Sequence, residues 1–342
     1  MRFIHVGVGG FGQCWVQVLK GNKDAKVVAL VDVKDEPLQK ACETGGYDRS
    51  ICFKSLEEAI KKVEADAVVC STPPAFHKHD VITAMKAGLD VISEKPMSDT
   101  MASCKAMLKT AMETGRIYEV SQNYRYSPAM WTLAQVVKSG RLGAIGQVKL
   151  DFFMGVDFGG GFRHEMPYPV IIDMSIHHFD LIRFVTGLDA VRVQGAAWNP
   201  PWSNYKGDCS STALFEMNNG ARILYNASWC AKGGFDDWNA SWQIECEKGS
   251  VTYRNGEIRI YDVPALYKVE KNEVVPHTPP PLMSQSYILD EFIRCAKTRQ
   301  RPNTEVRDNI RSIGMVFATV RAMETDRTVD VLDKDILALL KK

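Results

Sequence analysis

The sequence lacks a run of 18 uninterrupted apolar residues, a CxxC pair and an excess of charge of either sign. Without a long apolar run, no segment is expected to span a membrane. Nine scattered cysteines, an odd number, predict neither a disulfide framework nor a zinc knuckle, so we expect reduced thiols in a cytoplasmic protein. A glycine turn begins already at Gly7, which disfavours a signal peptide.

The charges nearly cancel, with 42 basic and 41 acidic residues. A broad basic surface is therefore not expected, which disfavours nucleic acid and anionic membranes as partners. A chain of 342 residues with 45% hydrophobic composition has the size of about two folded domains. The expected partner is a small molecule or another protein chain.

Two halves of the chain differ in periodicity. Up to about residue 140, β-branched runs at 3–6, 27–31, 67–70 and 91–92 alternate with helical patterns at 12–19, 56–63, 80–87 and 101–114. This alternation predicts parallel strands covered by helices on both faces. From about residue 146, period-two alternation at 148–152, 221–229 and 242–247 predicts half-buried antiparallel strands, followed by helices at 286–298 and 306–325. One mixed sheet face could pair with a neighbouring subunit.

A glycine-rich turn directly follows the first predicted strand. Gly7, Gly9 and Gly12 stand at GxGxxG spacing, which suits a tight turn, close approach to a pyrophosphate and close helix packing. Asp32 lies 20 residues after Gly12, where its carboxylate can bind a ribose diol and repel the extra phosphate of NADP. The pattern predicts NAD, with NADP less favoured; the alternative is that Asp32 only ends or caps an element, and Lys34 weakens the preference.

Further motifs follow in order along nearly the whole chain. They are Ser71-Thr72-Pro73-Pro74 with His77, Glu94-Lys95-Pro96, Asn123-Tyr124-Arg125, Asp173-Met174-Ser175-Ile176-His177 leading into Asp180, and the helix from Val306. With the glycine turn, this ordered set resembles the Gfo/Idh/MocA family of glucose-fructose oxidoreductase, inositol dehydrogenase and rhizopine catabolism proteins. Two positions depart from the family pattern: Pro74, where many members have Asn, and Ser175, where Gly is common.

The resemblance implies an α/β fold with two domains. A Rossmann domain with a doubly wound parallel sheet is expected over residues 1–122. A C-terminal α/β domain with a large open, mainly antiparallel sheet is expected over residues 123–342, for substrate binding and oligomerisation, with its last helices returning toward the first domain. Most members oxidise or reduce a secondary alcohol of a sugar or cyclitol. We therefore expect an NAD-dependent oxidoreductase that forms a homodimer or homotetramer.

The resemblance also assigns site residues. Catalytic roles are implied for Lys95, Asp173 and His177. Cofactor contacts are expected from Gly7, Gly9, Gly10, Phe11, Gly12, Asp32, Ser71, Thr72, Pro73, His77, Glu94, Lys95 and Asn123. Substrate contacts are expected from Lys95, Tyr124, Arg125, Arg163, His164, Asp173 and His177.

The chemistry of alcohol oxidation supports the catalytic set independently. A base must take the hydroxyl proton, and His177 titrates in the right range. Asp173 lies four residues before His177 on a helix predicted to begin after Pro169, so both side chains would share one face. Asp173 could orient the imidazole or bind a neighbouring hydroxyl. Lys95, at the end of a strand, could stabilise a developing alkoxide. Alone, each residue could instead be structural or solvated.

The substrate is less well defined by the sequence. A loop with Gly159-Gly160-Gly161 carries Arg163 and His164, which can donate hydrogen bonds to hydroxyls. Aromatic residues such as Trp198, Trp202 and Trp229 could cover the C–H surface of a sugar, or belong to a core or subunit contact. No carboxylate- or phosphate-specific cluster is evident, which favours a neutral polyol, sugar, anhydrosugar or glycoside.

Three functions remain open at this point. The first is an NAD-dependent dehydrogenase of a sugar, anhydrosugar or cyclitol. The second is a glycoside-cleaving enzyme that oxidises the sugar transiently and eliminates the aglycone, so that NADH would not accumulate. The third is a non-catalytic sugar or nucleotide sensor, which would not need Lys95, Asp173 and His177 together. We expect no metal, because hydride transfer to NAD needs none and consecutive side chains such as His177 and His178 diverge on a helix.

Overall fold

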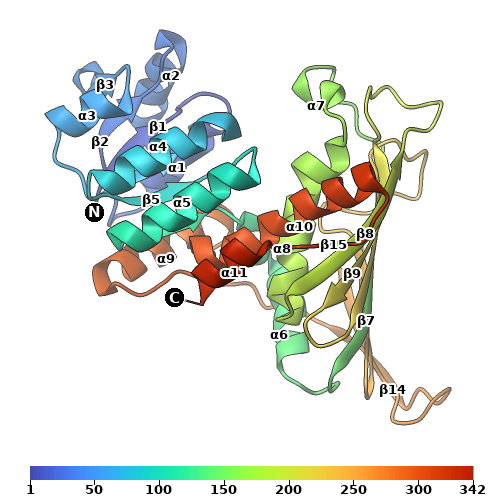
Figure 1. Cartoon of the computed structure of the whole chain (residues 1–342). Coiled ribbons are helices and arrows are strands. Elements are labelled where there is room, and N and C mark those ends of the chain that lie inside the picture. The colour runs from blue at the N-terminus through green and yellow to red at the C-terminus, as the bar shows by residue number, and fades with distance from the viewer. Residues whose placement is uncertain (342) are drawn as a thin grey trace. The chain divides into compact units, whose positions relative to one another are not determined.

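The chain divides into two compact units in a computed structural model that describes residues 1–341 (Figure 1). The first unit combines Met1–Asn123 with Leu282–Ile310 and the last described residues from Leu339. The second unit holds Tyr124–Pro281 and Arg311–Ala338. No helix within residues 1–341 is long and apolar enough to cross a membrane. The nine cysteines, all within this range, are free thiols, although the sulfur atoms of Cys42 and Cys52 lie only 3.4 Å apart.

The first unit contains a six-stranded parallel sheet with the order β3-β2-β1-β4-β5-β6. Its strands are β1 Arg2–Val6, β2 Lys26–Val31, β3 Cys52–Phe53, β4 Ala67–Cys70, β5 Asp90–Ser93 and β6 Tyr118–Val120. Every residue of β4 and β5 is buried, as expected of strands covered on both faces. The order reverses between β1 and β4, and ligands of doubly wound sheets bind at such a reversal, beyond the carboxyl ends of the strands.

The helices predicted at 12–19, 56–63, 80–87 and 101–114 are all present in this unit, whereas the helix after β2 was not predicted. They are α1 Gly12–Gly21, α2 Asp35–Gly45, η1 Arg49–Ile51, α3 Leu56–Lys62, α4 Pro74–Lys86, α5 Met101–Thr114 and α9 Ser284–Thr298. The helix predicted at 80–87 begins earlier, at Pro74, because the fixed φ of proline and its missing N–H suit the first helical position. The α5 helix begins after Thr100, whose side chain accepts a hydrogen bond from the backbone of Ser103, and it ends at Gly115 in the left-handed conformation.

The second unit contains a nine-stranded sheet with the order β14-β13-β12-β11-β7-β10-β9-β8-β15. Its strands are β7 Ile145–Phe153, β8 Ala190–Trp198, β9 Ser210–Met217, β10 Arg222–Ser228, β11 Ser241–Cys246, β12 Gly249–Arg254, β13 Glu257–Asp262, β14 Lys271–Val275 and β15 Val329–Asp330. Only β7 and β10 pair in parallel, so the sheet is mainly antiparallel, as expected. The alternation in β10 is confirmed, because Ile223, Tyr225 and Ala227 are buried.

The remaining helices lie wholly or mostly in the second unit, and two of them carry the predicted catalytic motif. The remaining elements are η2 Asn123–Tyr126, α6 Pro128–Lys138, α7 Phe162–Glu165, η3 Val170–Met174, α8 Ser175–Thr186, α10 Val306–Thr325 and α11 Lys334–Leu340. The single helix predicted after Pro169 is wrong in detail, because η3 is a π-helical turn and the α-helix begins only at Ser175. Asp173 therefore lies in the π turn and His177 in α8. Such wide turns are rare and often mark functional sites.

Candidate active site

The glycine turn lies between the carboxyl end of β1 and the start of α1. Gly7 has a φ of +80°, and a Cβ there would lie 2.6 Å from the backbone nitrogen of Thr72. A Cβ on Gly12 would lie 2.0 Å from the carbonyl oxygen of Gly7. Both positions therefore require glycine. Gly10 has no atom within 4 Å of its Cβ position, which leaves the backbone on that side open to a ligand.

Asp32 lies at the end of β2, beside this turn. One carboxylate oxygen accepts a hydrogen bond from the backbone of Lys34 at 3.0 Å, and the other lies 3.8 Å from the Cβ position of Gly9. The carboxylate and the open backbone thus belong to one local surface. A dinucleotide fits this arrangement, with its pyrophosphate at the turn and its ribose diol at Asp32. Phe11, which is 54% exposed, borders the same turn.

Ser71 braces the turn with its side chain. Its hydroxyl donates to the carbonyl oxygen of Gly7 at 2.8 Å and lies 2.9 Å from Nε2 of His5. His5 is completely buried, and burial lowers its pKa to about 3. The imidazole is therefore neutral in the folded protein, and it fixes the hydroxyl that holds the turn.

Thr72 and His77 connect the loops that follow β4 and β5. The Thr72 hydroxyl donates to the Asp80 carboxylate at 2.8 Å, and the ring nitrogens of His77 lie 2.7 Å from the carbonyl of Thr72 and 3.1 Å from that of Pro96. His77 is fully buried, which lowers its pKa. Both side chains are thus already bonded within the unit, and Pro73 precedes α4 as its N-cap.

The Glu94-Lys95-Pro96 motif directly follows β5. The Glu94 carboxylate is buried and accepts a hydrogen bond from the indole nitrogen of Trp15 at 2.7 Å, and burial raises its pKa. The peptide bond between Lys95 and Pro96 is cis. Asn123, at the other end of the unit's main segment, donates to the Ser284 hydroxyl at 3.1 Å.

His177 and Tyr124 stack in the second unit. Their ring centroids are 4.0 Å apart and the ring planes differ by 16°. His177 is 5% exposed. Burial, together with the negative charges of Asp173 and Asp237, raises the pKa of Tyr124 to about 12. These carboxylates therefore lie close enough to act on the same ring. Asp237 was not predicted, because nothing in its local sequence distinguishes it.

Arg163 forms an ion pair with Asp173, and both residues are predicted to contact the substrate. Its Nε donates to Oδ2 of Asp173 at 2.6 Å. The guanidinium carbon also lies 4.7 Å from the ring centroids of both Phe158 and Phe162. The short helix α7 and its glycine loop thus bring a cation to the carboxylate before α8. Phe162 belongs to the stretch that the sequence indicates for the substrate, whereas Phe158 is not indicated by the sequence.

Arg125 and His164 have other partners than Arg163 and Asp173. Arg125 is buried, and two of its nitrogens lie 2.6 Å from the two carboxylate oxygens of Asp180, which also accepts a hydrogen bond from Ser312. The guanidinium of Arg125 is thus held in a buried ion pair, and its predicted substrate contact stays a prediction. His164 stacks on Tyr205, with ring centroids 4.5 Å apart.

Ser175, where the family commonly has glycine, belongs to a buried hydrogen-bond network. Its hydroxyl donates to the carbonyl of Val170 at 2.9 Å and lies 2.8 Å from the Tyr225 hydroxyl, which lies 2.8 Å from Nδ1 of His178. This network holds the π turn against β10. The ring of His178 is part of this hydrogen-bond network.

Residues 1–341 contain no group of three or more histidine, cysteine, aspartate or glutamate side chains that could hold a metal ion.

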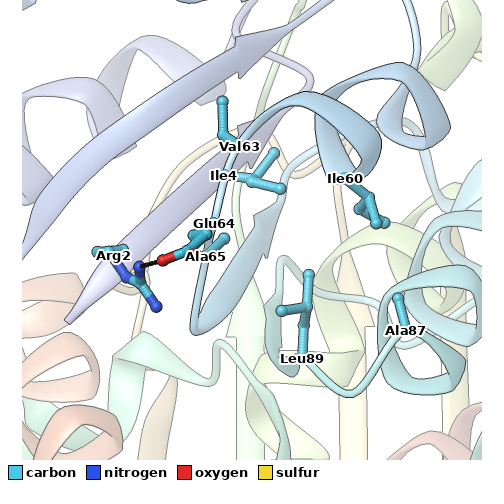
Figure 2. A pocket seen from close by; sticks show the side chains of 8 residues that line it. All are labelled: Arg2, Ile4, Ile60, Val63, Glu64, Ala65, Ala87 and Leu89. Atoms are coloured by element: carbon cyan, nitrogen blue, oxygen red, sulfur yellow. Dashed lines mark hydrogen bonds and ion pairs between the residues drawn. The ribbon is translucent and has the colours of Figure 1, made fainter.

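A cavity of about 380 Å³ lies elsewhere in the first unit (Figure 2). Figure 2 shows Arg2 and Ile4 of β1 with Ile60, Val63, Ala87 and Leu89 around it, and Arg2 paired with Glu64 at 2.7 Å. Arg2 begins β1, whereas the glycine turn follows its carboxyl end. The cavity contains none of the predicted site residues and is not the nucleotide site.

Comparisons with known proteins agree with this geometry. Residues 1–122 match the family model described as an oxidoreductase family with an NAD-binding Rossmann fold, and residues 130–252 match the GFO/IDH/MocA C-terminal domain. D-apiose dehydrogenase of Paraburkholderia graminis is 24% identical, with 95% of this chain and 88% of the relative covered. Inositol 2-dehydrogenase of Rhizobium meliloti is 23% identical, with 97% and 99% covered.

A solved structure supports the fold. An Agrobacterium radiobacter oxidoreductase, crystallised with NAD+, L-tartaric acid and magnesium, superposes with a TM-score of 0.87 at 20% identity, over 97% of this chain and 98% of that one. The glycine turn and the two matched domains lead to the same conclusion: the chain belongs to the Gfo/Idh/MocA family of oxidoreductases and carries its NAD-binding Rossmann domain.

Proposed function

We propose that the protein transfers hydride between NAD and a secondary hydroxyl or ketone of a neutral sugar, anhydrosugar or cyclitol. The observation that carries this proposal is the buried imidazole of His177, stacked on Tyr124 beside the Asp173 carboxylate, in a chain whose other unit has the NAD-binding turn. The names of the two dehydrogenase relatives, which act on apiose and inositol, support the substrate class.

Each catalytic residue has a distinct role in this proposal. Bound NAD supplies the hydride acceptor in the oxidative direction. His177 accepts the hydroxyl proton at a ring nitrogen, and the Tyr124 ring fixes the plane of that imidazole. The ammonium of Lys95 stabilises the oxygen that loses the proton. Asp173, which Arg163 holds at 2.6 Å, keeps a negative charge near the imidazolium that forms.

The cofactor preference is proposed to follow from Asp32. Its carboxylate beside Gly9 can accept both hydroxyls of the adenosine ribose, whereas a 2′-phosphate at the same place would meet a negative charge. We therefore expect NAD rather than NADP to support turnover.

The exposed face of the nine-stranded sheet supports an oligomer. Large apolar side chains remain exposed on separate strands, including Leu214 of β9 at 43%, Val274 of β14 at 49% and Trp198 of β8 at 49%. Exposed apolar groups spread over a sheet face favour contact with another chain. We propose a cytoplasmic homodimer or homotetramer.

The test is a substrate panel with purified protein and NAD at mildly alkaline pH. Polyols, aldoses, anhydrosugars and glycosides are supplied, and the absorbance of NADH is followed. Sustained NADH formation with a neutral polyol or sugar is expected. Release of an aglycone without net NADH would instead establish the glycoside-cleaving alternative, and binding without either reaction would establish a sensor.

A further inference from the structure

The guanidinium of Arg163 is held in place by three contacts within the second unit. Its Nε donates to Oδ2 of Asp173 at 2.6 Å, and its central carbon lies 4.7 Å from the ring centroids of Phe158 and Phe162. Attraction between a cation and an aromatic face adds to the ion pair. A long side chain that would otherwise sample many rotamers is thereby fixed before any ligand binds.

The same contacts leave part of the guanidinium able to bind a ligand. The bond to Asp173 uses Nε, so the two terminal nitrogens can donate to another group. The side chain is 32% exposed, which allows a small molecule to reach it. Because the guanidinium is a rigid planar fork, its terminal N–H groups match two oxygens held side by side.

A second donor lies beside Phe158. The Trp229 ring centroid is 5.1 Å from that of Phe158, and the indole is 1% exposed. Its Nε1 has no hydrogen-bond partner among residues 1–341. A buried N–H without an acceptor is unfavourable, so an oxygen from outside the chain is the natural partner. The guanidinium of Arg163 and the indole ring of Trp229 thus both contact Phe158.

The charge of this donor set is balanced. Asp173 compensates the charge of Arg163 at hydrogen-bond distance, so a carboxylate on the ligand would meet Asp173 and an ammonium would meet Arg163. We propose that Arg163, with Trp229 beside it, is a specificity-determining residue that binds two adjacent hydroxyls of a neutral polyol and disfavours sugar acids and amino sugars. This inference rests on the proposed function and names the feature of the substrate that is recognised.

The short helix that carries Arg163 also offers a matched control. Glu165, two residues further along α7, forms an exposed ion pair with Lys206 at 2.6 Å. Loss of this pair would loosen the same helix without touching Asp173. The Lys206→Gln variant therefore measures how binding changes when α7 is loosened but Arg163 is kept. The Arg163→Lys variant keeps a positive charge but lacks the planar guanidinium.

The experiment measures equilibrium binding to the full-length protein loaded with NADH. Isothermal titration calorimetry uses two neutral probes, myo-inositol and D-glucose, with D-glucuronate as the acid and D-glucosamine as the amine.

We expect the wild type to bind a neutral probe at least about tenfold more tightly than either charged probe. Arg163→Gln should weaken neutral binding at least about tenfold and shift the preference toward D-glucosamine, because the cation that pairs with Asp173 is then removed. Arg163→Lys should weaken neutral binding about threefold without that shift, and Lys206→Gln should stay within about twofold of wild type.

Several outcomes would overturn the inference. They are equal or tighter binding of D-glucuronate by the wild type, an equal loss in Lys206→Gln and Arg163→Gln, and no binding of any of the four probes. Because binding is read without turnover, the two proposals fail separately. A protein that selects neutral polyols but never produces NADH contradicts the proposed function alone, whereas an active enzyme in which Arg163→Gln leaves the binding constants unchanged contradicts this inference alone.

Discussion

The rings of Tyr124 and His177 lie face to face, 4.0 Å apart and within 16° of parallel. Removal of the ring in Tyr124→Leu should free the imidazole to rotate and lower kcat about 3- to 10-fold, the range expected from the 0.5–1.5 kcal/mol of an aromatic pair. Tyr124→Phe retains the ring and should stay within about twofold of wild type. Steady-state kinetics with NAD and the best substrate of the panel measure both. Equal losses in the two variants would assign the effect to the hydroxyl instead.

The acid–base assignment predicts larger losses than the stacking does. His177→Ala and Lys95→Met should each lower kcat at least about 100-fold, because each removes a group that moves a proton or stabilises the oxygen that loses one. Binding of NADH, followed by fluorescence, should remain in the His177→Ala variant, since this residue lies outside the unit that carries the glycine turn. Near-normal turnover in both variants would refute the assignment.

Cofactor selection depends on one carboxylate. The wild type should use NAD at least about tenfold better than NADP in kcat/KM, a difference of about 1.4 kcal/mol, and Asp32→Ser should reduce the ratio below about threefold. Asp35→Asn is the matched control, because the exposed Asp35 carboxylate pairs with Lys54 and Arg49. A ratio that Asp32→Ser leaves unchanged, or that Asp35→Asn changes equally, would remove Asp32 from this role.

The sequence predicts the fold well where the signal is local. The strand over 67–70 and the helix over 101–114 appear with the predicted limits, because their β-branched run and their Thr100 and Gly115 boundaries act within a few residues. The glycine turn was also readable, since its spacing reflects close approaches that only glycine permits.

Contacts between residues far apart in the chain could not be predicted from the sequence in the same way. Arg125 was expected at the substrate, yet it pairs with Asp180, which lies 55 residues away. The π turn of Val170–Met174 could not be predicted either, because its largely apolar sequence is compatible with both an α-helix and a π-helix. The pairing of Arg163 with Asp173 and the approach of Asp237 to Tyr124 likewise depend on how the loops fold.

A substitution at Gly12 tests whether the glycine turn is closely packed. A Cβ at this position would lie 2.0 Å from the carbonyl oxygen of Gly7, so Gly12→Ala must displace the backbone. We expect a loss of about 2–3 kcal/mol in the free energy of unfolding and weaker NADH binding. Gly21→Ala, at the far end of α1 with no atom within 4 Å of its Cβ position, should leave both quantities near wild type. Denaturant titrations and NADH titrations compare the two, and equal behaviour would contradict the steric argument.

Burial of His178 should make the stability of the folded protein depend on pH. Burial lowers its pKa to about 4, from an ordinary value near 6.5, so the folded protein keeps the ring neutral while the unfolded chain protonates it first. Unfolding therefore takes up a proton between these values. The free energy of unfolding should fall by about 1.4 kcal/mol per pH unit as the pH drops from 6.5 to 4, on the order of 3 kcal/mol from this residue, and its share of the loss should end below pH 4.

The variant His178→Gln removes this titration, so its stability should decline less steeply than that of the wild type across that window, even though it starts lower for lack of the bond to Tyr225. His79→Gln, which changes a ring that is 64% exposed, should reproduce the wild-type slope. Urea unfolding followed by tryptophan fluorescence at several pH values gives each slope. A His178→Gln slope equal to that of the wild type would contradict this prediction, because it would mean that the folded and unfolded states protonate this ring to the same extent. Protonation in the folded state is compatible with the hydrogen bonds, since the charged ring, Tyr225 and Ser175 can each donate in turn along their chain of contacts.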